Sequence, residues 1–233
     1  MPVTPNLEFQ LMGSNQSQKH VTFNESMLDL DVLVQLTVLS RQVSTPPVAP
    51  SLGDRYIVGD SATDLWSGQE GRIALWLNSH WKFFSPKEGW VATILDESNS
   101  VRYDGDSWVE QPVATGPWKA FTRARILSEE VTMDGAFVDT DIVIPDRAIV
   151  LAVSTRIVED ITGATSYDCG ISGDLAKFGG LLGILRFANN VGVIGPEAFY
   201  ADTPIRLTAN GGAFTGGVVR VAIHFLDFGV PDA

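Results

Sequence analysis

The sequence predicts a mainly β protein with an N-terminal α-helix, a small tryptophan-rich antiparallel β-module and a C-terminal jelly-roll-like β-sandwich. Three observations predict this fold class. Only residues 16–42 carry a long helical pattern of apolar side chains. Five of the six tryptophans fall among short strand-like runs between residues 54 and 110, and from residue 118 the strand-like runs become longer. We place the three segments at residues 1–45, 46–113 and 114–233.

The first segment is predicted to contain a polar arm followed by the helix. The first 15 residues include Pro2 and Pro5, and we expect them to form an extended arm. Thr22 and Glu25 have the spacing of a capping box, so the helix is expected over residues 22–40. Apolar residues then cover most of its circumference: Phe23, Met27, Leu28, Leu30, Val32, Leu33, Val34, Leu36, Val38 and Leu39.

A helix that is apolar on most sides must be buried on most sides, and a short helix is marginally stable alone in water. Two interpretations stay open. The helix is either a core helix of one domain or an assembly helix that packs against copies of itself. In the second case the residues expected at the interface between copies are Met27, Leu30, Leu33, Val34 and Leu36.

The second segment follows a proline-rich connection at residues 43–53 and alternates short β-type runs with turn signals. Asn78-Ser79 and Gly105-Asp106 are expected to be tight turns between aromatic runs, which gives two related hairpins. We therefore predict a compact antiparallel unit with no helix longer than two turns. The candidate strands are residues 55–59, 72–77, 80–84, 90–95, 100–104 and 107–111.

The third segment follows a second expected linker at residues 111–117. Its clearest strands are residues 148–158, 204–209 and 217–225, and in the last of these Val219, Val221, Ile223 and Phe225 are expected to share one face. Glycine pairs at residues 179–180, 211–212 and 216–217 are expected to mark turns. Evenly spaced strands with glycine turns predict the jelly-roll-like sandwich.

Composition excludes several partners and sites. A net charge of −12 argues against nucleic acid and anionic membrane surfaces. The start of the chain does not have the pattern of a signal peptide, and no apolar run predicts membrane insertion. Cys169 is the only cysteine, so no intrachain disulfide can form, and we expect a small buried thiol. The three histidines lie in different segments, so we expect no metal, and we expect no cofactor either.

Several strings resemble an uncharacterised domain family of phages and gene transfer agents, whose members look like spike or fibre components. These strings are QKHVTFNESMLDLDVLVQL (18–36), PPVAPSLGDRYIVG (46–59), the W-S-G-x-x-G-x-I-A-x-W run (66–76), the W-x-F-F-x-P-x-x-G-W run (81–90) and Y-D-G-x-S-W (103–108). The resemblance covers residues 7–110, and residues 161–174 and 178–180 resemble the part that often follows this module. It implies a role in a particle, made in the bacterial cytoplasm and released by lysis, with binding to host capsule polysaccharide and a homotrimeric state.

A search for catalytic chemistry finds no activated nucleophile and no paired carboxylates, so we expect no enzyme. Sugar rings present apolar C–H faces that lie on aromatic rings, while carboxylates and amides bind the hydroxyl groups. Trp76 and Trp90 sit in apolar strands and are expected in the core, whereas the exposure of Trp66 and Trp108 stays open. The candidate carbohydrate-binding residues are Trp66, Tyr103, Trp108, Tyr167, Asp168, Asp174 and Tyr200, the last four on predicted loops.

The leading hypothesis is a structural spike or fibre protein that binds a host surface polysaccharide for attachment. Two alternatives stay open. One is an adaptor that contacts only other particle proteins, and the other is a glycan-degrading enzyme.

Overall fold

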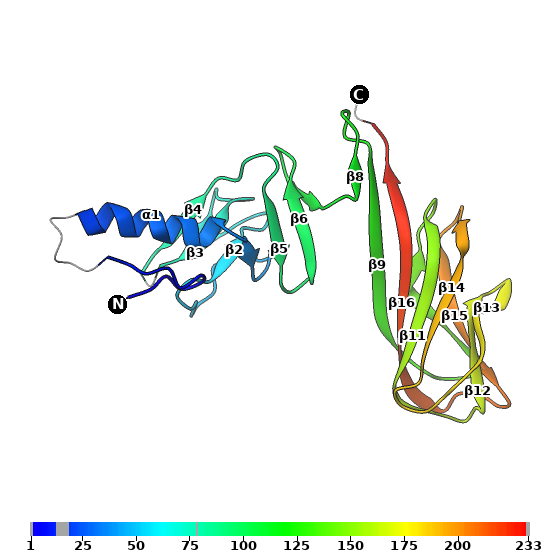
Figure 1. Cartoon of the computed structure of the whole chain (residues 1–233). Coiled ribbons are helices and arrows are strands. Elements are labelled where there is room, and N and C mark those ends of the chain that lie inside the picture. The colour runs from blue at the N-terminus through cyan, green and yellow to red at the C-terminus, as the bar shows by residue number, and fades with distance from the viewer. Residues whose placement is uncertain (1, 13–18, 78, 232–233) are drawn as a thin grey trace. The chain divides into compact units, whose positions relative to one another are not determined.

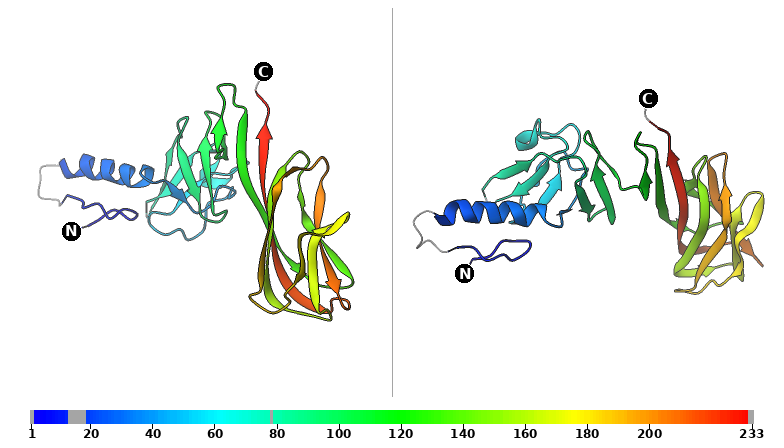
Figure 2. Two further views of the ribbon diagram at one scale, coloured as in Figure 1. Left: turned by 45° about the vertical axis from the view of Figure 1, so that its right-hand side comes forward. Right: turned by 45° about the horizontal axis from the view of Figure 1, so that its top comes forward.

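The computed structural model describes residues 2–12, 19–77 and 79–231 (Figure 1). The chain divides into two compact units, Met1–Gln111 and Pro112–Ala233, and each is described by itself. Both are built mainly from antiparallel strands, which confirms the predicted fold class (Figure 2).

The first unit contains one helix and two small sheets. Strands β2-β3-β4 form an antiparallel sheet, and β1-β5-β6-β7 form the other, in which β1 runs parallel to β5. The elements are α1 (Lys19–Leu33), β1 (Thr37–Val38), β2 (Arg55–Ile57), the 3-10 helix η1 (Asp64–Trp66), β3 (Ile73–Trp76), β4 (Trp81–Phe84), β5 (Val91–Ile94), β6 (Asn99–Tyr103) and β7 (Trp108–Glu110).

Strands β2 to β7 confirm the six strands predicted for the module, and the β3–β4 and β6–β7 pairs confirm its two related hairpins. Gly105 has a φ of +106° in the β6–β7 turn, a value that favours glycine. Asn78, which belongs to the other predicted turn, lies outside the described residues. Among the described residues of the range 54–110, the only helical element is the three-residue η1, so the prediction of no helix longer than two turns is confirmed.

The predicted bounds of the helix are wrong at both ends. Among the described residues helix α1 begins at Lys19, so Thr22 is an interior residue and its carbonyl accepts a hydrogen bond from the Ser26 hydroxyl. The helix ends at Leu33 because Gln35 turns the chain into the left-handed region, at φ +51°. Residues 37–38 then pair with β5. The apolar residues predicted to continue the helix therefore form part of a sheet.

The N-terminal arm is also not simply extended. Residues 2–12 form a tight hairpin with a bridge between Val3 and Gln10, and this hairpin is fastened to the helix by Asp31. The Asp31 carboxylate is fully buried and accepts hydrogen bonds from the Thr4 hydroxyl, the Asn6 backbone and side chain, and the Leu7 N–H. Burial by itself raises the pKa of Asp31, but these hydrogen bonds outweigh it and lower the pKa.

The second unit is a sandwich of two sheets. Its strands are β8 (Ala114–Thr115), β9 (Phe121–Thr132), β10 (Phe137–Ile144), β11 (Ile149–Thr162), β12 (Ser166–Ile171), β13 (Asp174–Leu182), β14 (Asn189–Ala198), β15 (Thr203–Asn210) and β16 (Gly216–Gly229). One sheet has the order β14-β11-β16-β9-β8 and the other β10-β15-β12-β13. From β9 to β16 successive strands lie in opposite sheets except for the β12–β13 hairpin, and this is the jelly-roll arrangement that the sequence predicted.

Side-chain alternation builds the core of this sandwich. Val219, Val221, Ile223 and Phe225 are at most 1% exposed, which confirms their predicted common face. Cys169 lies beside them in the core, and burial raises the pKa of its thiol to about 12. The expected linker at residues 111–117 contains β8, which pairs with β9. Only the glycine pair at residues 211–212 lies in a connection, whereas the other two pairs lie within β13 and β16.

Candidate functional site: a tryptophan-lined pocket in the first unit

A pocket of about 410 Å3 lies on the first unit. Trp108 forms part of its wall, together with an arginine, an amide and several acidic side chains drawn from four separate segments. The polar side chains that line it include Arg41, Gln42, Asp60, Glu70 and Asp106.

Strand β7 and the turn before it position Trp108. The indole N–H donates to the Gly71 carbonyl at 2.8 Å, which ties β7 to the segment leading into β3. The Tyr103 ring lies 5.4 Å away at 60°, so the two aromatic residues pack as a tilted pair. The carboxylate of Asp104 accepts the backbone N–H groups of Asp106 and Ser107 and thereby shapes the turn.

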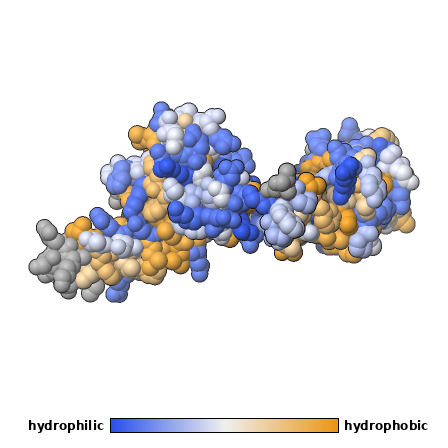
Figure 3. Space-filling view, turned by 90° about the horizontal axis from the view of Figure 1, so that it is seen from above, coloured by the Kyte–Doolittle hydropathy of each residue, from blue (hydrophilic) through white to orange (hydrophobic). Residues whose placement is uncertain are grey.

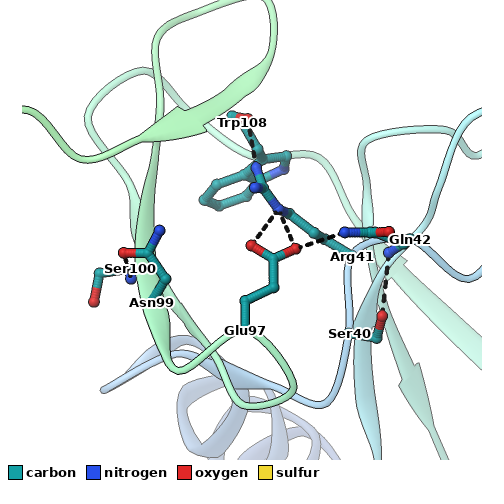
Figure 4. A network of polar contacts seen from close by, with 7 residues as sticks. All are labelled: Ser40, Arg41, Gln42, Glu97, Asn99, Ser100 and Trp108. Carbon is teal, nitrogen blue, oxygen red and sulfur yellow. Dashed lines mark hydrogen bonds and ion pairs between the residues drawn. The ribbon is translucent and has the colours of Figure 1, made fainter. Parts of the chain in front are cut away.

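Beside the tryptophan, an ion pair joins the turn between β5 and β6 to the chain that follows β1 (Figure 4). Arg41 Nε lies 2.8 Å from Glu97, and the Arg41 guanidinium also donates to the Trp108 carbonyl at 3.2 Å. The Gln42 amide donates to the same Glu97 carboxylate at 3.1 Å. Figure 4 shows the Arg41 and Gln42 side chains converging on the Glu97 carboxylate, with Arg41 also reaching the Trp108 backbone.

The Arg41–Glu97 ion pair shifts the pKa of both of its groups and affects the charge of the pocket wall. The Glu97 side chain is 19% exposed and that of Arg41 22%, so water screens their pair only in part. The hydrogen bond from Arg41 lowers the pKa of Glu97, and the same bond raises the pKa of Arg41. Since Arg41 is already committed to Glu97, the acidic side chains of Asp60, Glu70 and Asp106 leave the pocket wall with an excess of acidic groups.

Chemically, the pocket combines an aromatic ring, hydrogen-bond acceptors and one amide. Such a wall suits a ligand that has both an apolar face and many hydroxyl donors. Among the residues that the structure describes, no group of three or more histidine, cysteine, aspartate or glutamate side chains is arranged to hold a metal ion.

Two predicted binding residues are wrong because they are buried. Trp66 is 0% exposed and packs against the rings of Tyr56 and Trp81, at 5.5 and 5.0 Å. Tyr167 is 1% exposed and its hydroxyl lies 2.7 Å from that of Thr155 in the sandwich core. Burial raises the pKa of Tyr167 to about 12. Both side chains stabilise their units and present no face to a ligand.

The remaining predicted residues are dispersed. Asp168 and Asp174 lie in strands β12 and β13 and not in loops. The Asp168 carboxylate is occupied by the Leu181 N–H and the Asn210 amide, at 2.6 and 2.8 Å. Tyr200 does lie in a connection and is 82% exposed. Of the seven predicted residues, the structure therefore brings Tyr103 and Trp108 into contact.

The predicted assembly residues lie on different sides of the chain. Leu36 is 6% exposed and belongs to the core of the first unit, and Leu33 packs against that core, so neither is available to another copy. Leu30 and Val34 are 42% and 38% exposed, and Met27 is half-buried. Phe23, 41% exposed, lies on the same side by helical spacing. Figure 3 shows hydrophobic surface at this helical end of the unit.

Sequence reasoning missed the residues that line the pocket with Trp108, because Arg41, Asp60 and Glu70 are brought together only by the packing of the two sheets. One local signal was available. Asp106 follows the Gly105 turn and precedes Trp108, so a polar turn next to a tryptophan indicated one wall of the pocket.

The helix α1, with 15 residues, does not have the length or character of a membrane span, and the described part of the chain contains no helix that does.

Residues 23–109 match the model of a family described as proteins of unknown function, DUF2793. The match extends from α1 to β7 and so covers the pocket. None of the curated proteins matches the chain. Among solved structures, a chain of the cyanophage Pam1 capsid asymmetric unit is similar at 19% identity and a TM-score of 0.37, with 45% of this chain and 85% of that chain covered.

Proposed function

We propose that this protein is a structural spike or fibre component of a phage or gene-transfer-agent particle, and that it binds a host cell-surface polysaccharide through the Trp108 pocket. The observation that carries the proposal is the pairing of a half-buried tryptophan with acidic and amide side chains in one pocket of about 410 Å3. The sequence resemblance over residues 7–110 supports a structural role in such a particle. The proposed site of action is therefore the virion, after synthesis in the bacterial cytoplasm and release by lysis.

The chemistry of the pocket supports a sugar ligand. The Trp108 ring offers a flat apolar surface to the C–H face of a sugar ring. Carboxylates of Asp60, Glu70 and Asp106 accept hydrogen bonds from hydroxyl groups, and the Gln42 amide can donate and accept. The jelly-roll fold of the second unit occurs in viral capsid and lectin domains, which supports the proposal as a fold-level analogy.

The acidic charge of the pocket wall disfavours one class of polysaccharide. An excess of acidic side chains repels a polysaccharide that carries carboxylate or sulfate groups. We therefore propose a neutral or amino-sugar segment as the ligand. The proposed role is binding without catalysis, so release of reducing ends from the bound polysaccharide would contradict it.

We also propose that the protein is a homotrimer. Phe23, Met27, Leu30 and Val34 follow each other at spacings of four, three and four residues, the spacing of a coiled-coil seam. By helical spacing this stripe lies on the side of α1 opposite Val32, which is buried in the module core. Single sugar sites are weak, and several copies on one particle would raise the apparent affinity through avidity. Threefold symmetry follows the resemblance to fibre proteins.

The test of the pocket compares Trp108→Ala with the native protein for binding to purified host capsule polysaccharide. We expect at least a tenfold loss of affinity, which corresponds to about 1.4 kcal/mol. Trp118→Ala is the matched control, because Trp118 is 71% exposed and lies outside the pocket, and it should bind like the native protein. Binding is measured by biolayer interferometry with immobilised polysaccharide.

Because Trp108 also packs against the module core, its removal could lower stability. Asp106→Ala is therefore measured beside it, since Asp106 is exposed and its side chain can be removed without opening the core. Normal binding by both variants would contradict the proposal that this pocket is the polysaccharide-binding site. Absence of binding by the native oligomer to its host polysaccharide would favour an adaptor that contacts only particle proteins.

A further inference from the structure

The outward face of the five-stranded sheet in the second unit is unusually apolar. In an antiparallel sandwich one face of each sheet fills the core and the other faces water, so polar side chains are expected outside. Here the inner face carries Val153, Val221 and Ile223. The residues that alternate with them point outward, and several are aliphatic.

Two neighbouring cross-strand rows form the centre of this outer face. Strand register places Val193, Ala152, His224 and Ile126 side by side across β14, β11, β16 and β9. The next row is Val191, Ser154, Ala222 and Ser128. Val193, Val191 and Ile126 are 73%, 63% and 62% exposed. Further along β16, Leu226 lies opposite Ala124, and Phe228 is 53% exposed.

The polar groups in this centre are largely satisfied within the face. The Ser154 hydroxyl and His224 Nε2 lie 3.0 Å apart and form a hydrogen bond. A hollow of about 340 Å3 lies where the row of small side chains meets the charged end of the face. Its lining includes Ser128, Ser154 and Ala222 together with Glu130, Arg156 and Arg220. The two central rows contain no tryptophan, tyrosine or phenylalanine ring and no acidic side chain, so the centre does not have the groups that typically recognise a sugar.

Charged side chains are confined to one end of the face. Arg156 and Arg220 lie opposite each other on β11 and β16, and Arg220 forms a 2.7 Å ion pair with Glu130 on β9. The Arg220 and Glu130 side chains are 63% and 52% exposed. Because this end carries both signs of charge, it is electrostatically complementary to a second copy of itself.

We infer that copies of this chain associate through the outer face of the β14-β11-β16-β9 strands. Contiguous exposed aliphatic side chains mark an interaction surface, because soluble monomers seldom carry them. The face comprises four strands about 4.8 Å apart. Along them lie four cross-strand rows about 7 Å apart: the two central rows, the row of Leu226 and Ala124, and the charged row of Arg156, Arg220 and Glu130. Together they span roughly 500 Å2. That area approaches the ~800 Å2 that each partner contributes to a standard stable interface. This inference rests on the oligomer in the proposed function and assigns it a contact in the second unit.

The test measures mass by light scattering after gel filtration at tens of micromolar protein. In Ile126→Glu/Val193→Glu, each copy would bring two carboxylates into the interface. We expect the native protein to exceed the 25.2 kDa of one chain severalfold and this variant to have a lower mass than the native protein, because it loses the contact in the second unit. Both replaced side chains are mostly exposed in a single chain, so far-UV circular dichroism should not change.

Leu175→Glu/Leu181→Glu is the matched control, since both leucines are exposed but lie on β13 in the other sheet, and it should keep the native mass. Leu30→Glu/Val34→Glu tests the helix stripe separately. If Ile126→Glu/Val193→Glu keeps the native mass, this inference is wrong. Should the mass fall in the helix variant alone, the proposed oligomer stands with its contact on α1. A single-chain mass for the native protein would contradict both contacts between copies. The Trp108→Ala measurement would still test polysaccharide binding in the pocket.

Discussion

At the scale of single residues, burial changed the roles of several side chains. Asp31 interrupts an apolar run in the sequence, yet it is fully buried and anchors the N-terminal hairpin. Such a carboxylate can be buried because four hydrogen bonds replace the water that it loses. Trp66 is flanked by polar residues and glycine but fills an aromatic core. Neighbours in the sequence did not indicate the neighbours in space.

The Arg41–Glu97 pair leads to a prediction about pH. The pKa of Glu97 is lowered in the folded protein, so the pair contributes stability that is fully present above the unfolded pKa, 4.5. This contribution is lost as the pH falls through the lower folded pKa. We expect Glu97→Gln to lower the free energy of unfolding by about 1–2 kcal/mol at pH 7 and by progressively less below pH 4.5.

Urea unfolding at a series of pH values checks this expectation. Glu88→Gln is the control, because Glu88 is an exposed carboxylate on the same module, and its effect should be small at every pH. A Glu97→Gln deficit that stays constant from pH 7 to pH 3 would show that the charge of Glu97 does not stabilise the unit.

At the scale of elements, hydrogen-bond partners decided where the helix ends. Residues 34–40 have the apolar character of the helix before them, but the open edge of β5 accepts residues 37–38 as a parallel strand. The Thr93 N–H donates to the Leu36 carbonyl, and the Leu95 N–H donates to that of Val38. Backbone pairing with a strand more than 50 residues away in the sequence therefore ended the helix.

Strand β14 approaches the other sheet closely at one glycine. A Cβ atom placed on Gly192 would lie 1.8 Å from the Phe178 carbonyl oxygen, at a point where β13 and β14 come together. We expect Gly192→Ala to lower the free energy of unfolding by about 1–3 kcal/mol or more, because the two backbones would have to separate.

Gly195→Ala is the matched control for that change. Gly195 lies on the same strand, and a Cβ atom there would meet no atom within 4 Å. Chemical denaturation followed by far-UV circular dichroism compares the two variants. Equal stability of Gly192→Ala and Gly195→Ala would contradict the close approach.

At the scale of the whole molecule, each unit has its own hydrophobic core. The core of the second unit comprises residues between Leu127 and Phe225, and the two cores of the first unit comprise residues between Val32 and Trp108. We therefore expect residues 112–233 to fold when they are produced alone. The measurements are a cooperative thermal transition and a β-type circular dichroism spectrum.

A fragment of residues 133–233 is the control for this prediction. It lacks β8 and β9, so β16 would lose one of its two partner strands and Val131 would be missing from the core. This shorter fragment should not give a cooperative transition. If residues 112–233 were also unfolded alone, the second unit would depend on the first for its stability.

The sequence by itself determined the class of the fold and most of its strands. Period-two alternation and turn residues are local properties, so β2 to β7, β11, β15 and β16 were predictable from residues next to one another. The apolar positions of β16 likewise predicted which of its faces is buried. One wall of the candidate pocket, at Trp108, was predictable because a tryptophan beside a polar turn is visible in the sequence.

Only the tertiary structure decided the rest. The end of α1, the burial of Asp31, Trp66 and Tyr167, and the gathering of Arg41, Asp60 and Glu70 around Trp108 all depend on contacts between segments far apart in the chain. The apolar outer rows of the second unit depend on strand order and register, which place residues 126, 152, 193 and 224 side by side. Local patterns encode which residues alternate, but long-range pairing decides which of them meet.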